Sequence, residues 1–263
     1  MATRREFLTT ALAGVGAITV LPYAARAARH GADAFATPGG GEVSVHPISH
    51  ASLVLKTPNG TVYVDPVGDP AAYAEHGTPD LVMLTHQHGD HFEPSTLSAI
   101  LGEDTQIVTN PAVYDMLPAE MTDRAMAISN GVTGERNGIS IEAVAAYNIT
   151  EGRLDFHPKG RDNGYVLGID GLRVYISGDT EGTDEMRALD GIDVAFVCMN
   201  LPFTMSAAQA AAAVAEFKPK VVYPYHYRGR DNGTQDPKEF AVMLEAAGGG
   251  ADVKYGEWYP GGL

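Results

Sequence analysis

The sequence predicts one compact α/β domain in which helices cover β-sheets. Its 263 residues are 44% hydrophobic, which is enough to bury a large core and argues against disorder of the whole chain. Apolar runs alternate with turn residues, as in β-hairpins, and segments typical of helices lie between them. This mixed order is typical of layered α/β architecture.

Two segments are predicted to form β-hairpins. In "SLVLKTPNGTVYVDP" (52–66), two alternating apolar runs flank Pro58-Asn59-Gly60. In "GYVLGIDGLRVYISGDT" (164–180), two similar runs flank Asp170-Gly171. The two halves of the chain therefore contain similar hairpins.

Three segments are predicted to be helical: Pro94 to Leu101, Ala112 to Leu117, and Ser206 to Phe217, where the serine caps an alanine-rich run. The last is followed by a short apolar strand, "KVVYPYH". The single cysteine, Cys198, ends another apolar run and is predicted to be a core residue. We expect residues 29–263 to form one domain.

Residues 1–28 resemble a twin-arginine export signal. Arg4 and Arg5 precede an apolar run, Phe7 to Leu21, and Ala25-Arg26-Ala27 matches a small-residue cleavage pattern. Because this run has fifteen residues and a bilayer-spanning helix needs about 20, we expect cleavage and no stable membrane insertion. A periplasmic or extracellular location follows.

The chain is acidic, with 33 Asp and Glu against 18 Lys and Arg and a net charge of −15. Such a charge repels nucleic acids and anionic lipid surfaces, so we expect a small-molecule partner. Four cations lie in two loops beside candidate ligands and favour an anionic group on that partner: Lys159, Arg161, Arg228 and Arg230. Salt bridges to Asp162 and Asp231 are the alternative. The oligomeric state stays open.

The stretch "LVMLTHQHGDHF" (81–92) places three of the nine histidines within six residues. An apolar strand ends at Thr85, and Gly89 is expected to allow a tight reversal. Imidazole nitrogens and carboxylate oxygens bind transition metals. Because the loop alone offers four such groups, two metal sites could share it. The four groups are His86, His88, Asp90 and His91.

Asp179 and His226 stand in corresponding places, each directly after an apolar strand. With these elements, "THQHGDH", "SGDT" and "PYH" together resemble the metallo-β-lactamase-fold hydrolases, whose signature is HxHxDH followed by an Asp and a last His. The resemblance covers about the whole mature chain and implies a four-layer αββα sandwich. "YVDP", "AAYN" and "FHPKG" are similar to its lactonase and phosphodiesterase-like branch.

The resemblance also implies a ligand set and a reaction. It assigns His86 and His88 to a first metal, Asp90, His91 and His226 to a second, and Asp179 to a bridge between them. Two divalent transition-metal ions are implied, zinc first, with manganese, iron or nickel as alternatives. A hydroxide held between the ions would cleave an ester, lactone or phosphodiester bond.

One position departs from the family pattern. The first metal usually receives a third histidine before the bridging Asp, where this chain has Asn148, and His157 follows nine residues later. "HPKGRDNG" from His157 and "HYRGRDNG" from His226 are identical at six of eight positions. We therefore predict His157 as the ligand and Asn148 beside the water or substrate. Coincidental Asn-Gly turns are the alternative.

The remaining candidates have weaker signals. His50 precedes the first hairpin and is predicted to contact the substrate or a ligand; with Asp90 and Asn148 it completes the catalytic candidates. Asp65 is expected to orient a ligand histidine. His46 and His76 are expected at the surface or in packing, and Tyr147, Tyr225 and Tyr227 in the pocket or the core. A metal-binding protein without turnover and an iron-dependent oxidative enzyme remain the alternative functions.

Overall fold

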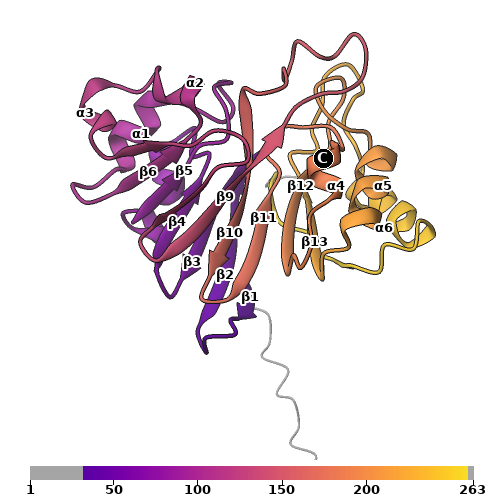
Figure 1. Ribbon diagram of the computed structural model, residues 1–263, viewed down its shortest axis with the longest axis horizontal. Helices are drawn as coiled ribbons and strands as arrows, with labels where there is room; N and C mark the ends of the chain where they lie inside the picture. Colours follow the sequence, from indigo (N-terminus) through magenta and orange to yellow (C-terminus); the bar gives the residue numbers. More distant parts are fainter. Residues whose placement is uncertain (1–31, 260–263) are drawn as a thin grey trace, which may run out of the picture. The chain divides into compact units, whose positions relative to one another are not determined.

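The computed structural model describes residues 32–259, which form two seven-stranded β-sheets and the helices that flank them (Figure 1). The predicted export signal, residues 1–28, lies outside the described residues. Among residues 32–259, no helix combines the length and apolar character that a membrane crossing requires.

The first sheet contains its strands in sequence order. They are β1 (Asp33–Ala36), β2 (Glu42–Ser49), β3 (Ser52–Thr57), β4 (Gly60–Val64), β5 (Leu81–Met83), β6 (Gln106–Thr109) and β7 (Ala125–Ala127). The strands from β1 to β4 pair antiparallel, and those from β4 to β7 pair parallel. The predicted hairpin around Asn59-Gly60 is confirmed as β3–β4.

The second sheet repeats this plan. Its strands are β8 (Thr133–Arg136), β9 (Ile139–Ala146), β10 (Asp162–Ile169), β11 (Leu172–Ile176), β12 (Val194–Cys198), β13 (Val221–Tyr225) and β14 (Asp252–Val253). Antiparallel pairing again changes to parallel after the fourth strand. The hairpin around Asp170-Gly171 is confirmed as β10–β11, with φ of 49° and 86° at the two turn residues, as a tight hairpin turn requires.

The helices are short except for two near the C-terminus. They are η1 (Pro70–His76, a 3₁₀ helix), α1 (Pro94–Ile100), α2 (Pro111–Tyr114), α3 (Ala119–Thr122), α4 (Asp184–Arg187), α5 (Ala207–Phe217) and α6 (Pro237–Ala246). The Ser206 side chain caps α5 as predicted. The predicted helix from Ala112 to Leu117 is shorter, because the Asn110 side chain caps a single turn that ends at Tyr114.

Side chains alternate across the first sheet between two cores. Leu53 and Leu55 of β3 point into the core shared with the second sheet, whereas Val54 between them packs with α1 residues such as Leu97. Helix α5 covers the other face of the second sheet, where Phe217 meets Tyr175 edge-on at 5.8 Å. The order helix, sheet, sheet, helix confirms the predicted αββα sandwich (Figure 1).

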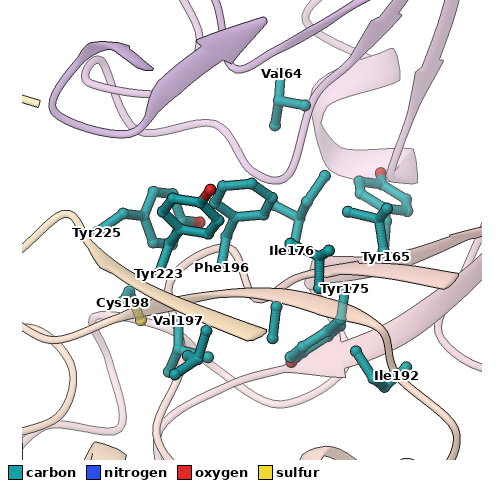
Figure 2. Close-up of a cluster of buried hydrophobic side chains, with 14 of the residues drawn as sticks. Val64, Tyr165, Tyr175, Ile176, Ile192, Phe196, Val197, Cys198, Tyr223 and Tyr225 are labelled. Atoms are coloured by element: carbon teal, nitrogen blue, oxygen red, sulfur yellow. The ribbon is translucent and has the colours of Figure 1, made fainter. Parts of the chain in front are cut away.

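Aromatic rings dominate one part of the core between the sheets. Phe196 stacks on Tyr223, with 4.9 Å between ring centroids, and Val64 of the first sheet lies opposite them (Figure 2). Cys198 is fully buried beside this group, which confirms its prediction as a core residue. The parallel strands that pass through this core end at one edge, and the polar loops that follow them meet there.

Candidate metal centre

The histidine loop begins where β5 ends. His86 and His91 are fully buried, His88 is half-buried, and the Asp90 side chain is 44% exposed. The loop closes because the backbone N–H of His91 donates to the His88 carbonyl over 2.9 Å. Gly89 lies in this turn, as predicted, although it is not among the described residues with positive φ.

Three other loops bring buried ligand candidates to the same place. His157 lies between β9 and β10, Asp179 follows β11, and His226 follows β13. These residues are 1%, 3% and 2% exposed, and the side chain of each faces the histidine loop. All seven predicted metal ligands are therefore gathered in one cluster, although they come from positions up to 140 residues apart (226 − 86 = 140).

The first donor group consists of His86, His88 and His157. Their donor nitrogens lie within 4.8 Å of one another, and the three pairs of ring centroids are 4.7 to 5.0 Å apart. Nε2 of His157 is 3.5 Å from Oδ2 of Asp179. Three imidazoles and one carboxylate oxygen thus face a common point.

The second donor group consists of Asp90, His91 and His226. Oδ1 of Asp179 is 3.3 Å from Nε2 of both His91 and His226. Oδ2 of Asp90 is 3.5 Å from Nε2 of His226 and 4.0 Å from Nε2 of His91. Asp179 therefore presents one carboxylate oxygen to each group, the arrangement expected of a bridging ligand.

The far ring nitrogen, Nδ1, of each buried histidine is held by a neighbouring side chain. Asp65 contacts His91 at 2.8 Å, as predicted, and Thr85, which donates to Asp65, lies 3.0 Å from Nδ1 of His86. Asp162 holds His157 at 3.0 Å, and the Asn200 amide holds His226 at 2.9 Å. Such contacts leave Nε2 of each ring directed at the cluster.

Sequence reasoning missed Thr85, Asp162 and Asn200 as orienting residues. Thr85 and Asn200 each stand close after a buried strand, at the same sheet edge as the ligands, which was a usable signal. Asp162 was considered only as a salt-bridge partner of Arg161. The structure shows that it has both roles, because its carboxylate also accepts from Arg161 at 2.6 Å.

The pKa values of the candidate ligands are shifted in different directions. Burial lowers the pKa of His86 well below its usual range, and the neighbouring His91 adds to this effect. Burial acts the same way on His91, but the carboxylates of Asp179 and Asp65 outweigh it and raise the pKa of His91 well above its usual range. Likewise, His226 and His91 overcome burial and hold the pKa of Asp179 well below its usual range.

Three atoms of the cluster that could bind a metal are buried without a hydrogen-bond partner. They are Nε2 of His86, Nε2 of His91 and Oδ1 of Asp179. Leaving such atoms unsatisfied is costly unless another group pairs with them. Imidazole and carboxylate donors in this number suit zinc, iron, manganese or nickel. The residues of both donor groups therefore suit the binding of transition metals.

Asn148 does not join either donor group. Its amide nitrogen donates to the carbonyls of Arg153 and Phe203, at 3.0 and 2.6 Å, and its backbone N–H donates to the His157 carbonyl at 2.8 Å. The side chain thus ties together the loops around His157. The expected position of Asn148 beside the water or substrate stays a prediction.

Two of the loop cations lie beside carboxylates. Arg161 pairs with Asp162, which favours the salt-bridge alternative at this position, and Lys159 lies 3.5 Å from Glu185. Arg228 and Arg230 lie over the rings of Tyr259 and Phe203. An anion-binding role for the latter pair stays a prediction.

The remaining predicted residues divide between the centre and the packing. His46 and His76 pack on each other with 4.9 Å between ring centroids, as expected of packing residues. His50 reaches the centre, where its Nε2 is 3.3 Å from Oδ2 of Asp90. Tyr225 is a core residue, fully buried among Phe196 and Trp258.

Comparison with known proteins agrees with this geometry. Residues 44–226 match the family model of the β-lactamase superfamily domain. A UPF0173 metal-dependent hydrolase from Pelotomaculum thermopropionicum is 33% identical over 216 residues, which cover 76% of this chain and 91% of the relative. A second, from Thermococcus onnurineus, is 29% identical over 219 residues, covering 77% and 92%.

A crystal structure of a protein from Parabacteroides distasonis, assigned as a metal-dependent hydrolase, superposes with a TM-score of 0.77 at 39% identity. The match covers 87% of this chain and 99% of that one. The metallo hydrolase Igni18 from Ignicoccus hospitalis shares the fold, with a TM-score of 0.66 at 23% identity. The chain therefore belongs to the metallo-β-lactamase superfamily and is one of its metal-dependent hydrolases.

Proposed function

We propose that the chain is a binuclear hydrolase that cleaves an ester, lactone or phosphodiester bond of a small substrate. The observation that carries this proposal is the position of Asp179, whose two oxygens face two separate donor groups. When bound, two ions in these groups would activate water and polarise the bond to be cleaved. Zinc is the first candidate, and manganese, iron and nickel suit the same donors.

The protein's own residues set the direction from which a substrate arrives. The Asp90 side chain is 44% exposed, whereas the side chains of His91 and Asp179 are 0% and 4% exposed. A substrate therefore approaches over Asp90 and the half-buried His88, while the other ligands stay shielded from water. Arg228 and Arg230, which follow His226, support a preference for an anionic substrate.

Two measurements test this function. Elemental analysis of protein purified with excess metal should find about two transition-metal ions per chain. A panel of p-nitrophenyl esters, lactones and bis(p-nitrophenyl) phosphate should reveal turnover that a chelator abolishes and added metal restores. His46→Gln, outside the centre, is the control variant.

The outcomes separate this proposal from its alternatives. One ion per chain under metal-replete conditions would contradict the binuclear centre. Two ions without turnover on the panel would favour a metal-binding protein that lacks activity. Oxygen consumption by the iron-loaded protein would favour an oxidative enzyme instead.

We also propose export by the twin-arginine route. Arg4 and Arg5 before the apolar run, which lie outside the described residues, support this proposal. Replacing both by lysine should retain the precursor in the cytoplasm, as measured by cell fractionation. Normal export of the Lys-Lys variant would contradict the route.

A further inference from the structure

We infer that His50 is a protein ligand of the second metal ion, through its Nε2 atom. His50 lies in the turn between β2 and β3, outside the HxHxDH loop and the three later ligand loops. One of its ring nitrogens, a carboxylate oxygen of Asp90 and a ring nitrogen of His226 lie within 4.8 Å of one another. This inference rests on the proposed binuclear centre.

The distances place His50 among the ligands. Its Nε2 is 3.3 Å from Oδ2 of Asp90, the same oxygen that lies 3.5 Å from Nε2 of His226. The ring centroids of His50 and His226 are 3.9 Å apart. One ion placed among these three atoms would replace direct contacts between them, just as in the first donor group.

The other ring nitrogen of His50 is held in the same way as in the buried ligand histidines. Nδ1 lies 2.6 Å from the hydroxyl of Tyr259, which also accepts from the backbone N–H of Arg228 at 3.3 Å. With its proton on Nδ1, the imidazole presents the lone pair of Nε2 to the cluster. Tyr259 therefore has the orienting role at His50 that Asp65 has at His91.

The turn itself fixes the direction of the ring. His50 has a φ of 53°, in the left-handed region that non-glycine residues seldom occupy, and its backbone N–H donates to the carbonyl of Trp258 at 3.2 Å. Trp258 is fully buried, so this anchor is packed in the core. The C-terminal segment thus holds both the backbone and Nδ1 of His50.

A simple hydrogen bond from His50 to Asp90 is the competing explanation. Hydrogen bonds to a charged group are about 2.7–2.9 Å long, and 3.3 Å exceeds this range. If His50 is a ligand, the second ion has four ligand side chains besides Asp179, whereas the first ion has three. The four are His50, Asp90, His91 and His226. The first ion would then keep more room for water and substrate.

Cobalt(II) binding tests the inference in the full chain. Wild type, His50→Ala, His50→Gln and the control His46→Gln would be titrated with cobalt(II), with calorimetry and visible absorption as readouts. We expect His50→Ala to bind one of the two ions more than about 100-fold more weakly, because losing a ligand should exceed the effect of losing an outer contact. The visible bands of that ion should also change, because its coordination number falls. The other ion should bind as in wild type, which also shows that the variant is folded.

His50→Gln separates the two explanations, because glutamine keeps an N–H donor for Asp90 but is a poor ligand for cobalt. The ligand role predicts that glutamine does not restore the affinity or the spectrum. Two ions bound by His50→Ala with wild-type affinity and bands would overturn the inference, as would full restoration by glutamine. Wild type that binds only one ion would overturn the binuclear function itself, so the two failures are distinguishable.

Discussion

The pattern H-x-x-G-R-D-N-G occurs at residues 157–164 and again at 226–233, and the two segments have different structures. In the first, the chain enters β10 at Asp162 and pairs with Ala146 of β9. In the second, Asp231 and Asn232 have φ of 53° and 68° and form an exposed turn. Tertiary pairing therefore decides the conformation, since six of the eight residues are identical.

The histidines at the start of both segments nevertheless reach Asp179. Nε2 of His157 faces one carboxylate oxygen of Asp179 at 3.5 Å, and Nε2 of His226 faces the other at 3.3 Å. Their supports differ, because Asp162 of the first segment holds His157, whereas Asn200 from outside the second segment holds His226. The two segments were expected to form equivalent loops, and this expectation is wrong. Their first residues, His157 and His226, nevertheless occupy corresponding places beside Asp179.

The largest effect should come from the first residue of each segment. His157→Ala should lose one ion and His226→Ala the other, with loss of most hydrolysis in both, because each variant removes a donor from a different group. Asn148→Ala should keep two ions, since its amide contacts only backbone carbonyls in the structure. Metal titration measures all three. Metal loss in Asn148→Ala with two ions in His157→Ala would reverse the ligand assignment.

Replacing the aspartate of each segment should have a smaller effect on metal affinity, and only in the first segment. Asp162→Asn weakens the acceptor for Nδ1 of His157 and should lower the affinity of the first ion by about 10–100-fold. Asp231→Asn is the matched control, because Asp231 is exposed in the second segment. Competition with a chromophoric chelator measures both. Equal metal affinities in the two variants would show that the contact with Asp162 does not support the metal site.

Much of the fold and the ligand set could be predicted because the signals are local. Alternating runs around Asn59-Gly60 and Asp170-Gly171 determine hairpins, and ligands that directly follow strands meet at one sheet edge. The histidine partners of Asn200 and Tyr259 could not be predicted, because these contacts join distant segments. Asn200 reaches His226 across 26 residues, and Tyr259 reaches His50 across 209.

The smallest expected effect is on the free energy of unfolding, when the asparagine of each segment is replaced. Asn163 is buried, accepts from Asn130 at 2.7 Å and donates to the Ile128 carbonyl at 2.9 Å. Asn163→Ala leaves the buried Ile128 carbonyl without a donor, whereas the half-buried Asn130 keeps its bond to the Asp162 carbonyl at 2.8 Å. One unsatisfied buried group costs about 1–3 kcal/mol, so the free energy of unfolding should fall by about 2 kcal/mol.

Asn232 is the matched position in the second segment, where it is exposed with positive φ. Asn232→Gly should change the free energy of unfolding by no more than about 0.5 kcal/mol, because glycine adopts this backbone conformation without strain. Urea denaturation at one fixed metal concentration measures both variants, since bound metal adds to the apparent stability. Equal losses in Asn163→Ala and Asn232→Gly would mean that the first segment is as loosely held as the second. In that case, the burial of Asp162 at the start of β10 would not explain why His157 is held by a residue of its own segment.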